Sequence, residues 1–212
     1  MADLAGRRLY LCTEDRADLA SFLAACIRGG VDVVQLRDKE LEALPLLRRA
    51  EVAIDVCRQF GVPFILNDRP DLALACRADG VHVGQDDAPP WLAREILGPG
   101  ALVGRSTHAP AELRAAAGEP VDYLSAGPVN PTPTKPGRPG TGLGYLELVR
   151  REAALPWFVT GGVTPQTVAA MMAAGARRFV AVRYLTAAAD PEAQARRLVD
   201  AIDAIDASTA QD

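Results

Sequence analysis

Eight short runs of β-favouring residues recur along the chain, and each is followed by a segment whose apolar residues have helical spacing. The runs are apolar at almost every position, which is typical of parallel strands covered by helices. The segments between them, such as ADLASFLAACIRGG (17–30) and TPQTVAAMMAAGA (164–176), carry glycine near their ends, where a helix C-cap belongs. Eight such units predict a closed (β/α)8 barrel. The predicted strands are RLYLCT (8–13), VDVVQLR (31–37), PFILN (63–67), GVHVG (80–84), ALVGRS (101–106), VDYLSAG (121–127), WFVT (157–160) and RFVAVR (178–183).

An open, doubly wound parallel sheet is the alternative architecture. Such a sheet gathers its binding residues at one switch point, often with a G-x-G-x-x-G turn after the first strand. No such turn follows residues 8–13, and polar residues end many of the predicted strands instead. We therefore favour the barrel, whose site would lie at the C-terminal ends of the strands.

The composition is that of an ordinary globular protein, with 49% hydrophobic residues, 24% charged residues and a formal net charge of −4. The basic residues are dispersed along a mildly acidic chain, which argues against a nucleic-acid partner. No apolar stretch reaches the roughly eighteen residues of a membrane span, and no leader-like segment begins the sequence. We therefore expect a cytoplasmic protein that does not bind a membrane.

The length predicts a single domain over residues 1–212, with disorder allowed for in about the last six residues. The four cysteines form no C-x-x-C pair, so we expect them to be reduced core residues. The sequence leaves open whether the chain forms a homo-oligomer.

Three polar residues alternate at the end of the second predicted strand, in QLRDK (35–39). Alternate positions of an extended chain share one face, so Gln35, Arg37 and Lys39 would point the same way. Arginine offers a bidentate fork and lysine a compact charge, and the pair suits a phosphate or a diphosphate. The alternative is an exposed strand end whose charges lie in solvent.

The next two predicted strands end in acidic residues, within NDRPD (67–71) and GVHVGQDD (80–87). At the rim of a barrel, Asp68 and Asp87 would face the cations of the second strand. Mg²⁺ is held by one or two carboxylates plus phosphate oxygens, so this pair predicts a magnesium site. The alternative is that each aspartate caps the helix that follows it. We interpret His82, inside the strand, as a packed histidine.

Two further strand ends carry groups suited to an anion. The fifth predicted strand leads into Ser106, Thr107 and His108, although Ser106 or Thr107 could instead cap the next helix. The seventh leads into Gly161 and Gly162, where the backbone can approach a ligand closely and offer N–H donors. Loops after the seventh and eighth strands of barrels commonly bind phosphate.

One long loop stands out, because NPTPTKPGRPGTG (130–142) is too rich in proline and glycine for a helix or an inner strand. Loops of this length are uncommon in compact domains and are either functional or disordered.

Six fragments stand in an order and spacing that resembles the thiamine-phosphate synthase family. The resemblance covers nearly all of the chain, and it implies a (β/α)8 barrel that works with Mg²⁺. It also implies the reaction, a dissociative substitution that joins hydroxymethylpyrimidine diphosphate to thiazole phosphate, releases diphosphate and forms thiamine phosphate. The fragments are QLRDK, NDRPD, GVHVGQDD, STH, GPVNPTPTK and TGGVT.

The resemblance assigns roles to residues at the matching positions. Gln35 corresponds to the residue that reads the aminopyrimidine, and Asp68 and Asp87 correspond to the magnesium ligands. The matching diphosphate binders are Arg37, Lys39, Asn67, Ser106 and Lys135, of which Arg37, Lys39, Ser106 and Lys135 would carry catalysis.

The resemblance also implies a thiazole phosphate site, held by Thr132, Thr134 and the backbone of Gly162. Loop 130–142 would then be a lid that excludes water from the reaction. The chain departs from the family at VAVRYL, where Arg183 replaces a small serine-containing segment. We predict that Arg183 reaches the phosphate, and the alternative is an outward arginine paired with a helix carboxylate.

Two other functions fit the same barrel. A thiazole tautomerase would need the thiazole phosphate site but not the diphosphate and metal residues, and their retention argues against it. A non-catalytic phosphate-binding barrel is the second alternative, because a fold and its anion sites do not establish turnover. The absence of a clear catalytic triad does not decide against an enzyme, since in the reaction that the resemblance implies the thiazole nitrogen would attack with its own lone pair and would need no general base.

Overall fold

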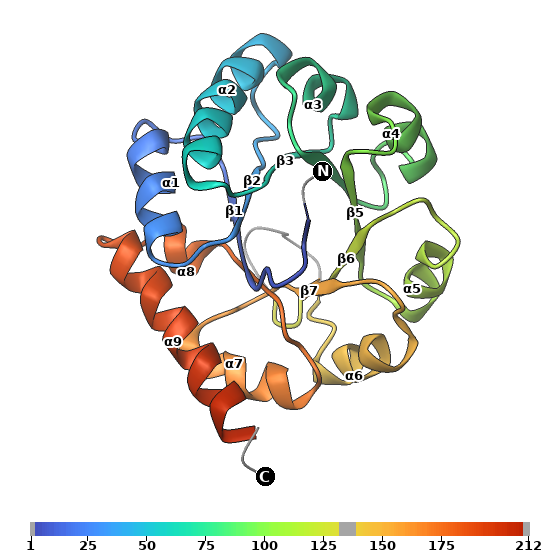
Figure 1. The fold of residues 1–212 in the computed structure, drawn as a ribbon. Helices are drawn as coiled ribbons and strands as arrows, with labels where there is room; N and C mark the ends of the chain where they lie inside the picture. Colours follow the sequence, from blue (N-terminus) through green and yellow to red (C-terminus); the bar gives the residue numbers. More distant parts are fainter. Residues whose placement is uncertain (1–2, 132–138, 210–212) are drawn as a thin grey trace.

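Eight parallel strands form a closed barrel in the computed structural model, which describes residues 3–131 and 139–209 (Figure 1). Each strand pairs with the next, and β1 also pairs with β8, so the sheet has no open edge. This closure confirms the predicted (β/α)8 barrel. The strands are β1 (Leu9–Thr13), β2 (Val33–Leu36), β3 (Phe64–Asn67), β4 (Gly80–Val83), β5 (Leu102–Thr107), β6 (Tyr123–Ala126), β7 (Trp157–Val159) and β8 (Phe179–Ala181).

The helices form a ring around the strands (Figure 1). Several of them begin with proline, whose fixed φ and missing N–H suit the first turn of a helix. The last helix, α9, packs against α1 and α7 and completes the ring. The helices are α1 (Leu19–Arg28), α2 (Ala43–Phe60), α3 (Pro70–Cys76), α4 (Pro90–Leu97), α5 (Pro110–Ala116), α6 (Leu143–Glu152), α7 (Pro165–Ala173), α8 (Arg183–Thr186) and α9 (Pro191–Thr209).

The strands separate two apolar cores, because successive side chains of a strand point to opposite faces. In β1, Leu9 and Leu11 pack in the larger core between barrel and helices, whereas Tyr10 belongs to a smaller cluster inside the barrel. Toward the C-terminal ends of the strands the interior becomes polar. The buried polar side chains there include Gln35, Asn67, His82, Ser106 and Ser125.

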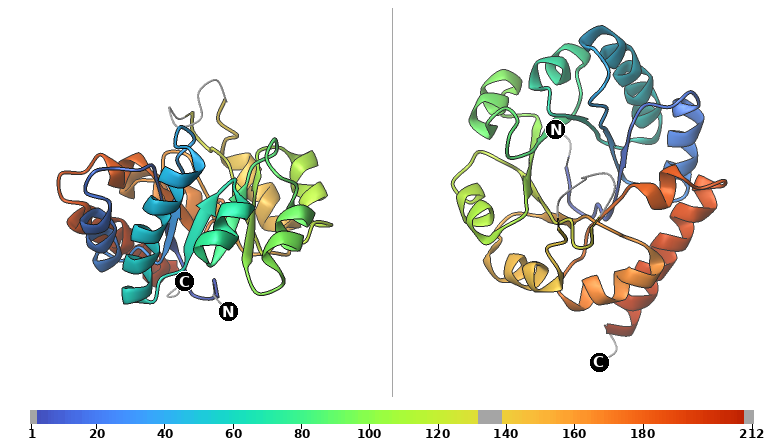
Figure 2. Two further views of the ribbon diagram at one scale, coloured as in Figure 1. Left: turned by 90° about the horizontal axis from the view of Figure 1, so that it is seen from above. Right: turned by 180° about the vertical axis from the view of Figure 1, so that it is seen from behind.

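The opposite end of the barrel is closed by the chain that precedes β1. Leu4 is only 5% exposed and packs into the inner cluster with Val33, Leu102 and Phe158. Both ends of the chain lie on this side, while the chain on either side of residues 132–138 rises from the other face (Figure 2). The polar face of the barrel is therefore the open one.

Strand β8 is shorter than the predicted run 178–183, because it ends at Ala181 and the chain turns into α8 at Arg183. At the end of the chain, α9 continues to Thr209 and residues 210–212 lie outside the described part, so the predicted disordered tail stays a prediction. None of the four cysteines forms a disulfide, as expected, and three of them are buried. Within residues 3–131 and 139–209, no helix has the length and apolar character needed to cross a membrane.

Candidate active site

A cavity with a volume of about 520 Å³ lies at the C-terminal ends of the strands. Its floor is the buried aromatic cluster of Tyr10, Tyr123 and Phe158, in which Phe158 packs edge-on against both tyrosines. Five of the predicted site residues line the cavity, and so does His82, which was predicted to be a packed histidine. The five are Gln35, Arg37, Asn67, Ser106 and Arg183.

Gln35 is held from two sides at the floor of the cavity. Its side chain is buried, its Oε1 lies 3.0 Å from Cys12 Sγ, and its Nε2 donates to Tyr10 Oη at 3.0 Å. Arg37 lies one residue beyond the end of β2 and also lines the cavity, so the predicted alternation continues past the strand.

Lys39 joins the two aspartates that were predicted to bind metal. Its Nζ lies 2.8 Å from Asp68 Oδ2 and 3.8 Å from Asp87 Oδ1. These three residues do not line the cavity, but Asp68 directly follows Asn67 and Lys39 lies two residues after Arg37, and both Asn67 and Arg37 line it. The structure thus brings the two carboxylates and one cation together at the edge of the cavity.

The alternative that the aspartates cap helices is wrong for both. The N-cap residues of α3 and α4 are Arg69 and Pro89, and neither helix has a side-chain cap. Asp87 instead accepts a hydrogen bond from the backbone N–H of Gly84 at 2.8 Å. Asp68 has φ of 62°, a left-handed conformation that non-glycine residues adopt rarely and that is common at functional sites.

The two carboxylates share one environment, but the pKa of Asp68 is raised and the pKa of Asp87 is lowered. Burial and a hydrogen bond with Asp87 raise the pKa of Asp68, and Lys39 only partly offsets them. Burial also acts to raise the pKa of Asp87, but the hydrogen bonds from Asp68 and Gly84 and the charge of Lys39 hold it below its usual value. Asp87 is therefore the more readily ionised member of the pair.

Two carboxylates suit Mg²⁺, which takes oxygen ligands and usually completes its shell with water and phosphate oxygens. Within the described part of the chain, no cluster of three or more His, Cys, Asp or Glu side chains is arranged to hold a metal by itself. Asp68 and Asp87 would therefore need further oxygen ligands, such as those of substrate or water, to hold Mg²⁺, and their role stays a prediction.

Ser106 faces the cavity and not the following helix. Its Oγ lies 2.9 Å from His82 Nε2, and Thr107 Oγ1 donates to the carbonyl of Ser125 at 3.3 Å. The N-cap of α5 is Ala109, without a side-chain cap, so the capping alternative for Ser106 and Thr107 is wrong. His108, in contrast, does not line the cavity, and its Nδ1 contacts the carbonyl of Gly127.

A second hollow, with a volume of about 340 Å³, adjoins the cavity after β7 and β8. Gly161 and Gly162 line it with φ of 99° and 78°, in the left-handed region that glycine adopts without strain. A Cβ on Gly162 would lie 2.9 Å from Asn130 Nδ2, so a side chain there would crowd the chain after β6.

Arg183 lines both hollows from the first residue of α8. Its side chain is exposed, and it makes no hydrogen bond or ion pair with any residue in the described part of the chain. The outward alternative, an arginine paired with a helix carboxylate, is therefore not found among the residues described.

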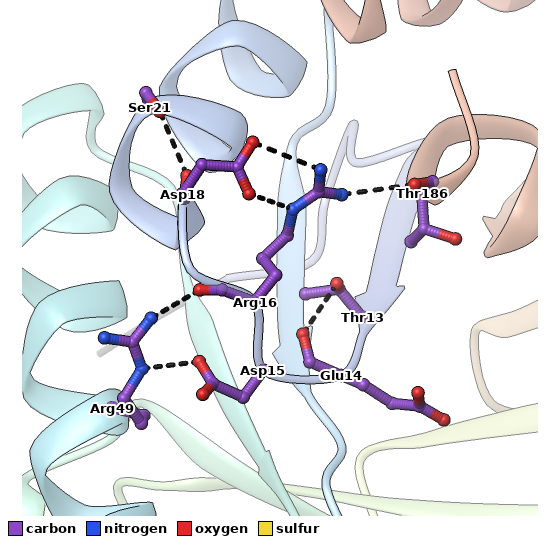
Figure 3. A network of polar contacts seen from close by, with 8 residues as sticks. All are labelled: Thr13, Glu14, Asp15, Arg16, Asp18, Ser21, Arg49 and Thr186. Atoms are coloured by element: carbon purple, nitrogen blue, oxygen red, sulfur yellow. Dashed lines mark hydrogen bonds and ion pairs between the residues drawn. The ribbon is translucent and has the colours of Figure 1, made fainter. Parts of the chain in front are cut away.

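The β1–α1 loop forms a wall of the cavity that the sequence analysis missed. Arg49 of α2 binds Asp15 and the carbonyl of Arg16, and Arg16 donates to the carbonyl of Thr186 at 3.2 Å (Figure 3). The Arg16 guanidinium also donates two hydrogen bonds to the Asp18 carboxylate, as Figure 3 shows. Through Arg49 and Thr186 the loop is fixed to both α2 and α8. Only the charge content of TEDRAD (13–18) could have drawn attention to it.

Thr132, Thr134 and Lys135 lie outside the described residues. Their predicted contacts with thiazole phosphate and diphosphate, and the predicted lid over residues 130–142, stay predictions.

Comparison with known proteins identifies the family. The sequence profile of the family described as "Thiamine monophosphate synthase" matches residues 9–185. The chain belongs to the thiamine-phosphate synthase family. Its relatives in this family include the thiamine-phosphate synthases of Mycobacterium sp. (strain KMS), 48% identical with 94% of each chain covered, and of Streptomyces avermitilis, 51% identical with 91% of this chain and 92% of that protein covered.

A solved structure agrees with this membership. Thiamine phosphate pyrophosphorylase from Pyrococcus furiosus superposes with a TM-score of 0.85 at 25% identity, over 94% of this chain and 96% of that one. The shared barrel and the shared sequence therefore point to one family.

Proposed function

We propose that this member of the thiamine-phosphate synthase family joins 4-amino-2-methyl-5-hydroxymethylpyrimidine diphosphate to thiazole phosphate, giving thiamine phosphate and diphosphate. The observation that carries the proposal is the meeting of Lys39 with Asp68 and Asp87 beside the cavity. Cationic side chains and carboxylate-bound Mg²⁺ both stabilise a diphosphate, and this edge of the barrel has one lysine and two carboxylates that would hold the metal.

The pyrimidine end of the substrate would bind at the floor of the cavity. An amide can donate to a ring nitrogen and accept from an exocyclic amino group at once, so Gln35 suits an aminopyrimidine. The diphosphate would then extend toward Arg37, Asn67 and Ser106, which line the same cavity. Lys39 and Lys135 would add charge at its far end.

The thiazole phosphate would occupy the second hollow, with its phosphate at the backbone of Gly162 and beside Arg183. Thr132 and Thr134 would hold the same group from the loop after β6. This arrangement would place the thiazole nitrogen near the methylene carbon of the pyrimidine, and orientation of two reactants can supply about 7–11 kcal/mol.

The chemistry would be a substitution without proton transfer. The C–O bond to diphosphate breaks with its electron pair on oxygen, and the thiazole nitrogen lone pair forms the new C–N bond. Mg²⁺, when bound, would neutralise the leaving diphosphate. Arg37, Lys39, Lys135 and Ser106 would stabilise the same charge by ion pairs and hydrogen bonds, and exclusion of water would protect the pyrimidine-methyl cation.

A reconstitution assay tests the proposal. Purified protein is mixed with both substrates and Mg²⁺, and thiamine phosphate and diphosphate are measured over time. Stoichiometric formation of both products is the expected result. Binding of the substrates without product would indicate a non-catalytic barrel, and conversion of a thiazole tautomer alone would indicate a tautomerase.

We also propose a cytoplasmic enzyme of one domain that binds small molecules and no nucleic acid. The dispersed basic residues and the net charge of −4 support this proposal. Sedimentation of the purified protein would determine whether the chain forms a homo-oligomer.

Arg183→Ser should weaken binding of thiazole phosphate by about tenfold or more, because it removes one charge-assisted hydrogen bond. Binding of pyrimidine diphosphate should stay nearly unchanged. Isothermal titration of each ligand checks both values. Arg197→Ser on the outer helix α9 is the matched control, since Arg197 contacts Gln194 of its own helix. Equal thiazole phosphate affinity in the two variants would show that Arg183 does not bind the phosphate.

A further inference from the structure

A continuous row of hydrogen bonds crosses the floor of the cavity, inside the barrel. It begins at Cys12, whose Sγ lies 3.0 Å from Gln35 Oε1. It continues from Gln35 Nε2 to Tyr10 Oη at 3.0 Å, and from there to Tyr123 Oη at 3.1 Å. All four side chains are buried.

The second half of the row reaches the opposite wall of the barrel. Tyr123 Oη lies 3.2 Å from His82 Nδ1, and His82 Nε2 lies 2.9 Å from Ser106 Oγ. The row therefore starts beside the residue proposed to read the pyrimidine, Gln35, and ends at one proposed to bind the diphosphate, Ser106.

Counting hydrogens gives the row a direction. A side-chain amide nitrogen only donates, so Tyr10 Oη accepts from Gln35. Among the described residues, Tyr123 Oη is the other hydrogen-bond partner of Tyr10 Oη, so it is the acceptor for the Tyr10 hydrogen. Tyr123 then donates to His82 Nδ1, which places the imidazole hydrogen on Nε2. Burial raises the pKa of both phenols, so both hydrogens are retained at neutral pH.

The end of the row has a chemical consequence. His82 Nε2–H donates to Ser106 Oγ, so the serine hydroxyl keeps its own hydrogen for another acceptor. Within the described part of the chain, no second hydrogen-bond partner of Ser106 Oγ is found. Ser106 can therefore donate into the cavity, which suits an anionic oxygen that only accepts.

The opposite direction would arise if the Gln35 amide were rotated by half a turn. Every hydrogen in the row would then point back toward Gln35, and Ser106 would donate to His82 and show only lone pairs to the cavity. Cys12 opposes this rotation. In the observed orientation the Cys12 thiol donates to the amide oxygen, whereas after rotation its sulfur would have to accept from the amide nitrogen, which is a weaker interaction.

We propose that Tyr10, Tyr123 and His82 are positioning residues that fix the Gln35 amide and the Ser106 hydroxyl in one mutually consistent orientation. The inference rests on the proposed function for the roles of Gln35 and Ser106. Its consequence is specificity for a 4-aminopyrimidine, because a 4-oxo analogue needs the amide reversed, and that reversal turns the Ser106 hydroxyl away from the diphosphate.

The tautomer of His82 tests the row directly. The chain has only two histidines, so long-range ¹⁵N–¹H spectra of the unliganded protein resolve both rings, and His82→Gln assigns them. We expect the His82 hydrogen on Nε2 at neutral pH. A hydrogen on Nδ1 would overturn the proposal, and this measurement requires neither a variant of Tyr10 or Tyr123 nor any enzymatic activity.

Kinetics of Tyr123→Phe provide the second test. Loss of the donor to His82 Nδ1 should raise the KM for pyrimidine diphosphate by about tenfold and populate both His82 tautomers. Tyr145→Phe is the matched control, because Tyr145 lies on α6 outside the cavity and donates to the Ala109 carbonyl. Unchanged KM in folded Tyr123→Phe would overturn the proposal.

Two substitutions of Cys12 test the row with little change in side-chain volume. Cys12→Ser retains a donor to Gln35 Oε1 and should keep the wild-type KM, whereas Cys12→Ala should raise it and relax the preference for the amino over the oxo pyrimidine. Equal kinetics of the two variants would contradict the role of Cys12. If the wild-type protein forms no thiamine phosphate, the proposed function fails while the tautomer result still stands on its own.

Discussion

Asp87→Asn should lower kcat by about 100- to 1000-fold, the cost typical of removing one group that stabilises a developing charge. Asp68→Asn should have a comparable effect. Both residues contact Lys39 and would hold Mg²⁺ with the diphosphate oxygens. Because Lys39 is half exposed, its ion pairs add little to stability, and both variants should remain folded.

Steady-state rates at increasing Mg²⁺ concentration check this prediction, together with circular dichroism of each variant. Asp71→Asn is the matched control, because Asp71 pairs with Arg69 and its side chain is 54% exposed. Excess chelator should abolish wild-type activity. Full activity of the wild-type protein or of both variants in chelator would contradict the metal assignment.

Gly104→Ala should lower the free energy of unfolding by about 2–3 kcal/mol, the usual range for overpacking a tight interior. A Cβ at this position of β5 would collide with the Tyr123 ring and with His82 Nδ1. The two rings cannot move apart without breaking their hydrogen bond. The residue is glycine because the row of hydrogen bonds passes where its side chain would be.

Thermal unfolding of Gly104→Ala measures the effect, with an expected decrease in Tm of about 5–10 °C for a chain of this size. Gly144→Ala on α6 is the matched control, since a Cβ there meets no atom within 4 Å. That control should be neutral or slightly stabilising, because alanine favours helix over glycine. An unchanged Tm in Gly104→Ala would show that the barrel relaxes around the added methyl group.

The barrel was predictable because the pattern of an apolar strand followed by an amphipathic helix occurs eight times, and each occurrence can be recognised within a short stretch of sequence. The inward direction of Gln35 and Arg37 was predictable for the same reason, since it follows from the two-residue period of a strand. The left-handed backbone of Asp68 was not predictable, because an aspartate before Arg69 and Pro70 equally suits a helix cap.

The row from Cys12 to Ser106 could not be read from the sequence for a different reason. Its members come from five strands, and whether two inward side chains meet depends on the stagger between those strands. The sequence therefore marks His82 as buried, but only the register shows that it lies between Tyr123 and Ser106. The turn from β8 into α8 at Arg183 likewise has no local stop signal in RFVAVRYL (178–185).

The contact between Arg16 and α8 bears on how this part of the protein can vary in evolution. Arg16 donates to the main-chain carbonyl of Thr186 and not to its side chain. The contact to the helix that carries Arg183 therefore does not depend on which side chain stands at position 186. We therefore expect no correlated substitutions between positions 16 and 186 in related sequences. A search for coevolving pairs would miss this contact, because its acceptor is a main-chain carbonyl.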